Sequence, residues 1–261
     1  MKFNNVVNNS EISTSGIAGT RPMSPEGRWS LWIDVEGFSE IYRRNETDAL
    51  LALGWLLESI FKIGTTIYSD GPGRLFAHQF GDGLVVVSNF PEDSAERPIA
   101  IAISVMRHLI ARGVACKSAV ACGGFSDVGG CFSESIFENS QDRHIVSMGA
   151  GLMTIIPVMG TALITSHKLS SQRRGAVLLI RDECFKTIPK EAVISLKAPT
   201  AVDWIHSELA LARRISSKAG LIYDESSDAA VCLRKYIDVQ GSSAGDEWVT
   251  STIEANRLNV L

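Results

Sequence analysis

The sequence has few cysteines, and no spacing ties them together. The five cysteines among 261 residues are odd in number, and none forms a CxxC pair. The sequence therefore indicates neither a disulfide framework nor a zinc knuckle. The five residues are Cys116, Cys122, Cys131, Cys184 and Cys232.

The sequence also has no excess of basic residues and no long apolar run. The formal net charge is −4 and the isoelectric point is about 5.8, so nonspecific nucleic-acid binding is not indicated. No stretch approaches the roughly 18 uncharged apolar residues that a membrane helix needs. The start, "MKFNNVVNNSEISTSG", is too polar for the core of a secretory signal. The composition predicts a soluble cytoplasmic protein.

What is present is an alternation of helical and strand patterns. Residues 1–28 are rich in Asn, Ser, Thr and Gly and predict a flexible arm. After it we expect a strand, a helix from Ser39 to about Ile63, two strands around a Gly-Asp-Gly turn, a second helix and another strand. This β-α-β-β-α-β order predicts an α+β fold with a ferredoxin-like core.

The remainder of the chain has weaker signals. Residues 145–159 are apolar and fit either helix or strand, whereas residues 161–171 predict a short helix and residues 175–180 a strand. Residues 200–216 predict a late helix. What residues 185–261 contribute stays open.

Two aspartates occupy unusual places in this pattern. Asp34 ends the first apolar strand, and Asp82 lies in the turn between the next two. In a β-α-β-β unit the first strand lies beside that hairpin, so the two carboxylates can meet at one edge of the sheet. Paired carboxylates repel unless a cation joins them, and hard oxygen ligands favour Mg²⁺ or Mn²⁺.

Each aspartate alone has a simpler interpretation. Asp82 alone is typical of a turn residue, and Asp34 alone could cap the helix that follows. The joint placement and the segment Gly37-Phe38-Ser39 favour the metal interpretation, because free amides at a helix start can bind a triphosphate.

The motifs "DVEGFS" and "FGDGLVVV", in this order, resemble the catalytic core of class III nucleotidyl cyclases over about residues 29–182. The resemblance implies that Asp34, Asp82 and the carbonyl of Val35 bind two divalent cations, Mn²⁺ or Mg²⁺. It implies that Gly37, Phe38 and Ser39 contact the triphosphate. Residues 183–261 would form a C-terminal extension packed on or following this catalytic domain.

The chain departs from the family pattern at the base pocket. His78 stands where purine cyclases have a base-selecting lysine. In "PVMGTALITSHK", Gly160 is retained, but Pro157 replaces the base-reading Asp, Ile164 the Asn and Lys168 the Arg. Lys168 can still supply positive charge to a phosphate, though without a guanidinium fork.

These departures leave three functions open. The chain is similar to the pyrimidine cyclases of Pycsar antiphage systems, which implies a UTP or CTP substrate, with UTP favoured, and a cyclic nucleotide that acts on a separate effector protein. The alternatives are a catalytically degenerate, dimeric nucleotide-binding module and an adenylate cyclase with an atypical base pocket. The resemblance also implies a head-to-tail homodimer with active sites at the interface, for which residues 145–159 are suited.

Overall fold

The fold is taken from a computed structural model that describes residues 28–71, 73–127, 133–141, 145–155, 158–194, 199–223 and 226–258. Residues 1–27 of the predicted arm lie outside the described residues, and Arg28 belongs to the first strand. Pro157 also lies outside the described residues.

The first half of the chain forms the expected β-α-β-β-α-β unit. Its strands are β1 (Arg28–Val35), β2 (Leu75–Phe80), β3 (Gly83–Ser88) and β4 (Cys116–Gly123). They lie in the order β4-β1-β3-β2, and each neighbouring pair is antiparallel. This is the ferredoxin-like arrangement, so the predicted α+β fold class is confirmed.

Three later strands extend the sheet on the β4 side. β10 (Leu178–Ile180) pairs parallel with β4, and β12 (Thr200–Val202) and β11 (Val193–Ile194) follow with antiparallel pairings. The helix predicted over residues 200–216 is therefore wrong at its start. Asp203 accepts a hydrogen bond from the backbone N–H of His206 at 2.9 Å and turns the chain, and the helix α6 begins only at Ala210 (Ala210–Ala219).

The first predicted helix is divided in two. α1 (Phe38–Arg44) ends at Asn45, whose backbone is extended with φ −154°. The side chain of Asn45 then accepts hydrogen bonds from the N–H groups of Thr47 and Asp48, at 3.0 Å and 3.5 Å, and starts α2 (Glu46–Thr66). A single helix over these residues was wrong because an N-cap asparagine favours a new helix start over helix continuation.

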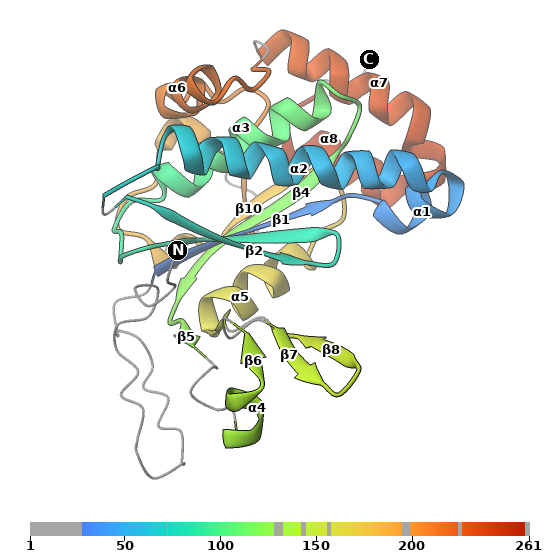
Figure 1. Ribbon diagram of the computed structural model, residues 1–261. Coiled ribbons are helices and arrows are strands. Elements are labelled where there is room, and N and C mark those ends of the chain that lie inside the picture. Colours follow the sequence, from blue (N-terminus) through green and yellow to red (C-terminus); the bar gives the residue numbers. More distant parts are fainter. Residues whose placement is uncertain are drawn as a thin grey trace.

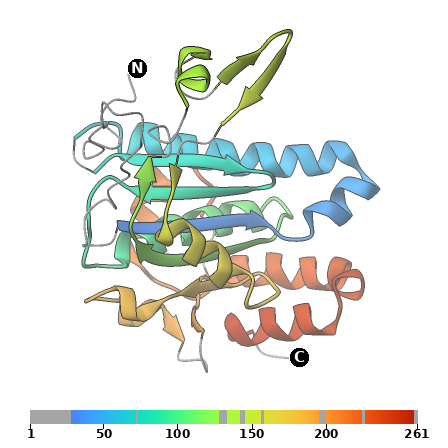
Figure 2. The ribbon, with the colours of Figure 1, turned by 90° about the horizontal axis from the view of Figure 1, so that it is seen from below.

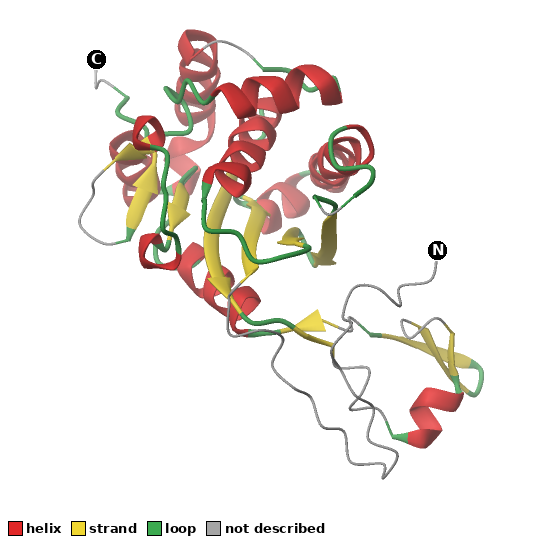
Figure 3. Cartoon of the chain, turned by 90° about the vertical axis from the view of Figure 1, so that its left-hand side faces the viewer, coloured by secondary structure: helices red, strands yellow, loops and turns green. Residues whose placement is uncertain are grey.

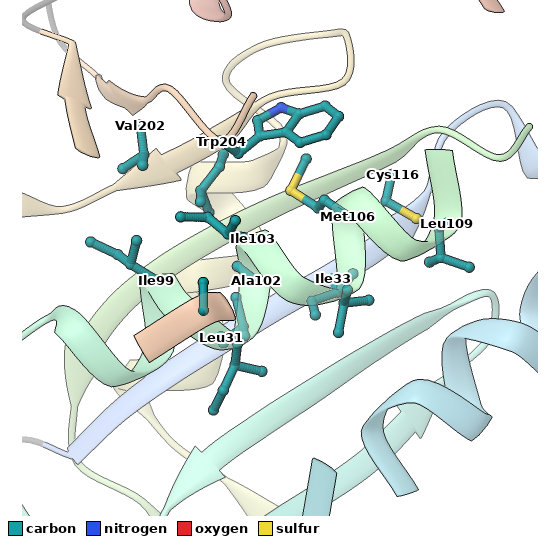
Figure 4. Packing of buried hydrophobic residues seen from close by; sticks show 14 of the residues in the cluster. Leu31, Ile33, Ile99, Ala102, Ile103, Met106, Leu109, Cys116, Val202 and Trp204 are labelled. Carbon is teal, nitrogen blue, oxygen red and sulfur yellow. The ribbon is translucent and has the colours of Figure 1, made fainter. Parts of the chain in front are cut away.

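Helices cover both faces of the sheet (Figure 1). α2 and α3 (Glu96–Ile110) lie over one face, and α5 (Thr161–Ser170) lies under β1 and β4 on the other. α3 is buried almost throughout, and Figure 4 shows its residues Ile99, Ala102 and Met106 packed near Leu31 and Ile33 of β1. Burial of this apolar surface, at roughly 25 cal/mol per Å², is the main favourable contribution to folding.

By length and composition alone, α2 could cross a membrane, the one helix of the described residues for which this holds. Its buried positions recur at helical spacing and face the protein, where α2 packs on α3, α6 and β1. They include Ala49, Ala52, Leu56, Ile60 and Ile63.

Residues 134–141 and 145–154 form an arm that stands away from the body (Figure 3). α4 (Glu134–Glu138) leads into a small sheet of β6 (Ser140–Gln141), β7 (Ile145–Met148) and β8 (Gly151–Thr154), and β5 (Ser126–Asp127) pairs with β9 (Val158–Met159) nearby. The ambiguous stretch from residue 145 is thus a hairpin followed by a short strand.

The chain ends in two helices that pack against the core. α7 (Ser226–Ala244) and α8 (Asp246–Ala255) follow α6, and short 3₁₀ helices lie at Asp182–Cys184 and Lys190–Ala192. Trp248 of α8 is buried and belongs to the same apolar cluster as Leu31 and Ile33 of β1. The predicted boundary between a catalytic domain and an extension stays a prediction.

Candidate active site

The structure brings Asp34 and Asp82 to one edge of the sheet. Asp34 is paired with Gly83 across β1 and β3, and Asp82 lies in the two-residue turn between Phe80 and Gly83. Figure 1 and Figure 2 show the end of β1 beside this turn from two directions. The tight turn is made by Gly81, whose φ of +60° is the positive value that such a hairpin needs at its first central position.

The surroundings of Asp34 disfavour its ionised form. Burial, and then the nearby charge of Asp82, raise the pKa of Asp34 to about 6 from 3.8, against an opposing effect of Lys117. The Oδ1 atom of Asp34 is buried and has no hydrogen-bond partner among the described residues. A buried unpaired acceptor costs about 1–3 kcal/mol, so the folded chain is less stable than it would be with this oxygen bound.

Gly83 lies close to that oxygen, where a side chain would not fit. A Cβ atom at this position would lie 3.2 Å from Asp34 Oδ1 and 3.0 Å from Cζ2 of Trp32. The sequence alone indicated a turn glycine here, and only the strand register shows that the missing side chain lets the β3 backbone lie close to Asp34.

The two carboxylates fit a divalent cation whose remaining ligands come from substrate and water. Within the described ranges no group of three or more His, Cys, Asp or Glu side chains could hold a metal ion. A Mg²⁺ ion is commonly held by one or two carboxylates plus substrate phosphates and water, rather than by a full protein cage. The unpaired Oδ1 and the absence of a side chain at Gly83 are consistent with such a site.

The proposed triphosphate turn directly follows Asp34. Val35 ends β1, and Gly37 is the N-cap of α1 with φ +70°, a left-handed conformation that favours glycine. Phe38 is half-buried, and Ser39 is exposed. The first amides of α1 have no partner within the helix, which leaves donors beside the carboxylates.

His78 lies on the same face of the sheet as Asp34. Directly opposed residues of antiparallel strands point to the same side, and His78 is opposite Val85, which is opposite Trp32. Trp32 and Asp34 are two residues apart on β1 and so share that face. The structure therefore places His78 one cross-strand row away from the row that holds Asp34.

Lys168 lies elsewhere, on α5. α5 crosses under β1, where Ser166 and Ser30 are joined by a 2.9 Å hydrogen bond. Lys168 is exposed and lines a cavity of about 630 Å³ with Ile164, Gln172 and Arg181, and the residues that line this cavity include neither aspartate.

The sequence analysis missed three residues beside Asp34. Lys117 of β4 is opposite Asp34 in the sheet, and its Nζ lies 2.8 Å from Oε1 of Glu36. The indole N–H of Trp248 donates to Oε2 of the same carboxylate, also at 2.8 Å. Glu36 lies within the quoted motif, but Trp248 is more than 200 residues away, so no local pattern could join them.

Comparison with known proteins gave no match to any family model and no match to any curated protein. Solved structures that are similar include a bacterial light-regulated adenylyl cyclase, with 10% identity over 84% of this chain and 59% of that protein at a TM-score of 0.40. A class III adenylyl cyclase-like ATP-binding protein from Pseudomonas aeruginosa is 15% identical, over 73% of this chain and 40% of that protein, at a TM-score of 0.42.

The guanylyl cyclase Cya2 is 12% identical over 70% of this chain and 92% of that protein, with a TM-score of 0.39. The chain spans less than two thirds of each of the first two proteins. At these low values of identity and TM-score, the inference of activity depends on the chain's own residues.

Proposed function

We propose that this chain is a metal-dependent nucleotidyl cyclase, a phosphorus–oxygen lyase that converts a nucleoside triphosphate to a 3′,5′-cyclic nucleotide and pyrophosphate. The observation that carries the proposal is the meeting of Asp34 and Asp82 at the same end of the neighbouring strands β1 and β3. There Asp34 holds a buried, unpaired oxygen, and Gly83 lets the β3 backbone lie close to it. Asp34 has a backbone hydrogen bond at Val35, but its Oδ1 has no partner among the described residues, and a turn or capping role alone does not explain that oxygen.

Asp34, Asp82 and the carbonyl of Val35 would hold two Mn²⁺ or Mg²⁺ ions. Bound there, the cations would supply the positive charge that activates the ribose 3′-hydroxyl and offsets charge on the departing pyrophosphate. Gly37, Phe38 and Ser39 would donate backbone hydrogen bonds to the triphosphate and orient its α-phosphate. Lys168 would neutralise phosphate charge. No side chain has to act as a dedicated general base.

The proposed substrate is a pyrimidine nucleoside triphosphate, with UTP favoured over CTP. Adenine requires an acceptor for its amine and a donor for its ring nitrogen, whereas Pro157 and Ile164 offer no side-chain hydrogen bond. His78, on the face that carries Asp34, can donate to a carbonyl oxygen of uracil. A site lacking a required partner discriminates by large factors, because the polar edge of the wrong base is left unpaired.

The proposed assembly is a head-to-tail homodimer. Within one chain the cavity that contains Lys168 does not include the two aspartates, so a second copy would have to bring Lys168 to them. The arm exposes apolar side chains that an isolated subunit would leave in water, with exposed fractions of 55% at Met148 and 67% at Leu152. Full activity in a monomer at low concentration would contradict this assembly.

The proposed setting is cytoplasmic antiphage signalling, with the cyclic nucleotide product acting on a separate effector protein. This part of the proposal depends on the resemblance of the altered base pocket to pyrimidine cyclases.

The direct test is to incubate the purified chain with each of ATP, GTP, CTP and UTP plus Mn²⁺, and to detect a cyclic product by mass. We expect cyclic UMP as the main product and its loss in Asp34→Ala and Asp82→Ala. Asp70→Ala is the matched control, because Asp70 is an exposed loop carboxylate near β2. Undiminished turnover in either site variant would refute the assignment of the carboxylates.

The same assay separates the alternatives. Binding of nucleotide without any cyclic product would favour a degenerate binding module, and ATP as the best substrate by kcat/KM would favour an adenylate cyclase with an atypical pocket. His78→Lys tests the base pocket separately, since an unchanged ratio of UTP to ATP turnover would exclude His78 from it.

A further inference from the structure

The C-terminal helices contact the segment that follows Asp34. Figure 1 and Figure 2 show α7 and α8 at the same end of the sheet as α1. The contact is made by Glu36, whose carboxylate has a different partner on each oxygen. Lys117 Nζ lies 2.8 Å from Oε1, and Trp248 Nε1 donates to Oε2 at 2.8 Å. We call Glu36, Lys117 and Trp248 the Glu36 bridge.

The Glu36 bridge is buried, so its interactions are strong and specific. Glu36 is 9% exposed and Trp248 5%, and the Lys117 side chain is 17% exposed. A carboxylate removed from water is costly unless it is paired and hydrogen-bonded. Hydrogen bonds to charged groups in such surroundings contribute more than neutral ones and fix direction as well as distance.

The bridge also joins the elements that carry the proposed metal site. Lys117 is directly opposite Asp34 in the β1–β4 register. The backbone N–H of Glu36 donates to the carbonyl of Ala115 at 3.0 Å, so the turn is held to the start of β4 by main chain and side chain together. Glu36 is itself the residue between Val35 and Gly37, so its contacts restrain the backbone on both sides of it.

A second contact supports the same attachment. Nη1 of Arg44, the last residue of α1, donates to Oε1 of Gln240 on α7 at 3.0 Å. α1 is therefore held at both ends, by the Glu36 bridge before it and by α7 after it. A helix of 7 residues has little stability of its own, so its orientation depends on such tertiary contacts.

We propose that the Glu36 bridge is a positioning device by which the C-terminal helices set the geometry of the segment from Asp34 to Phe38, and thereby the affinity of the site for divalent cation and triphosphate. The inference rests on the proposed cyclase function. The three residues act through Asp34 and the turn and do not themselves bind substrate. It assigns a role to residues 226–255, which sequence alone left without one.

The test compares two buried tryptophans whose indole N–H groups donate to different acceptors. Trp248→Phe removes the indole N–H that contacts Glu36 and keeps an aromatic ring. Trp204→Phe is the matched control, because the buried indole N–H of Trp204 donates to the carbonyl of Ala176 at 2.9 Å, away from the turn. Both variants lose one buried indole hydrogen bond. The carbonyl of Ala176 keeps Nδ2 of Asn256 as a donor at 2.9 Å, so we expect a smaller fall in Tm for Trp204→Phe than for Trp248→Phe.

Only Trp248→Phe should change the site. We expect the Mn²⁺ concentration that gives half-maximal thermal stabilisation to rise about fivefold to tenfold, together with the KM for UTP, while kcat changes by less than about threefold. Trp204→Phe should change these quantities by less than about twofold. Glu36→Gln, which retains an acceptor for Trp248 but loses the charge for Lys117, should shift Mn²⁺ affinity in the same direction.

Two outcomes decide the inference. If Trp248→Phe and Trp204→Phe have the same KM for UTP and the same Mn²⁺ concentration for half-maximal stabilisation, the inference is overturned. The bridge is then only a structural contact. Shifts that do not add in the double variant Trp248→Phe/Glu36→Gln would support it, because both changes then act through one carboxylate. Failure of the proposed function is seen separately, as Mn²⁺ stabilisation that persists in Asp34→Ala.

Discussion

Replacing Asp34 with asparagine should make the cation-free protein more stable while abolishing its activity. The pKa of Asp34 is raised to about 6 from 3.8, first by burial and then by Asp82. At pH 7 this ionised carboxylate destabilises the folded state by roughly 3 kcal/mol, at about 1.36 kcal/mol for each pH unit between the two pKa values. Asparagine has nearly the same shape and no charge. We therefore expect Asp34→Asn to raise the free energy of unfolding of the cation-free protein at pH 7 by about 1–3 kcal/mol.

The sign of the pH dependence follows from the raised pKa. The destabilisation by ionised Asp34 is fully present above about pH 7, decreases as pH falls through 6 and is absent below about 3.8. The difference in Tm between Asp34→Asn and the unchanged protein should therefore be several degrees at pH 7.5 and should approach zero near pH 4.

Thermal denaturation with and without Mn²⁺ is the assay. Mn²⁺ should raise the Tm of the unchanged protein and leave that of Asp34→Asn almost constant, because a cation that binds only the folded state stabilises in proportion to ln(1 + [L]/Kd). Asp70→Asn, at an exposed loop position, should behave like the unchanged protein. An equal or lower Tm for Asp34→Asn at pH 7.5, or a difference that does not vary with pH, would refute the reasoning.

Three further predictions concern single sites. Gly83→Ala should reduce Mn²⁺-dependent turnover by about a hundredfold while the sheet persists, because the new Cβ would lie 3.2 Å from Asp34 Oδ1; steady-state kinetics and circular dichroism check this. A hydrogen bond from Cys122 lowers the pKa of Cys184 to about 7, whereas the pKa values of Cys116 and Cys122 are raised, so iodoacetamide at pH 7 should alkylate Cys184 before those two, as read by peptide mass. Burial lowers the pKa of His108 to about 4, so the unfolded state takes up the proton first and stability falls by about 2 kcal/mol from pH 6.5 to 4. A urea titration series should show this fall reduced in His108→Gln.

Much of the fold followed from local patterns in the chain. The apolar strands, the Gly-Asp-Gly turn and the second helix are short-range signals, and their order is enough to predict a β4-β1-β3-β2 sheet. That order in turn predicts that Asp34 and Asp82 lie at one edge, since the first strand of such a unit pairs with the hairpin.

Other features were decided by contacts between distant residues. The first helix is divided at Asn45 because the Asn45 side chain caps the start of α2. The periodicity of apolar residues does not show whether a helix continues or begins anew at such a residue. The close approach of Gly83 to Asp34 depends on strand register, since a shift of one residue would place another residue of β3 opposite Asp34. The position of Lys168, in a cavity away from the carboxylates, depends on how α5 crosses the sheet.

The clearest case is Glu36. Within its motif it is an ordinary acidic residue between a strand and a helix, and nothing nearby requires a charge. Its partners Lys117 and Trp248 come from β4 and from the end of the chain, and they meet it only after the sheet has formed and α8 has packed. Sequence thus determined which residues could bind a cation, through local alternation of apolar and turn residues. The surroundings of those residues were decided only by tertiary packing, because burial and pairing depend on segments far apart in the chain.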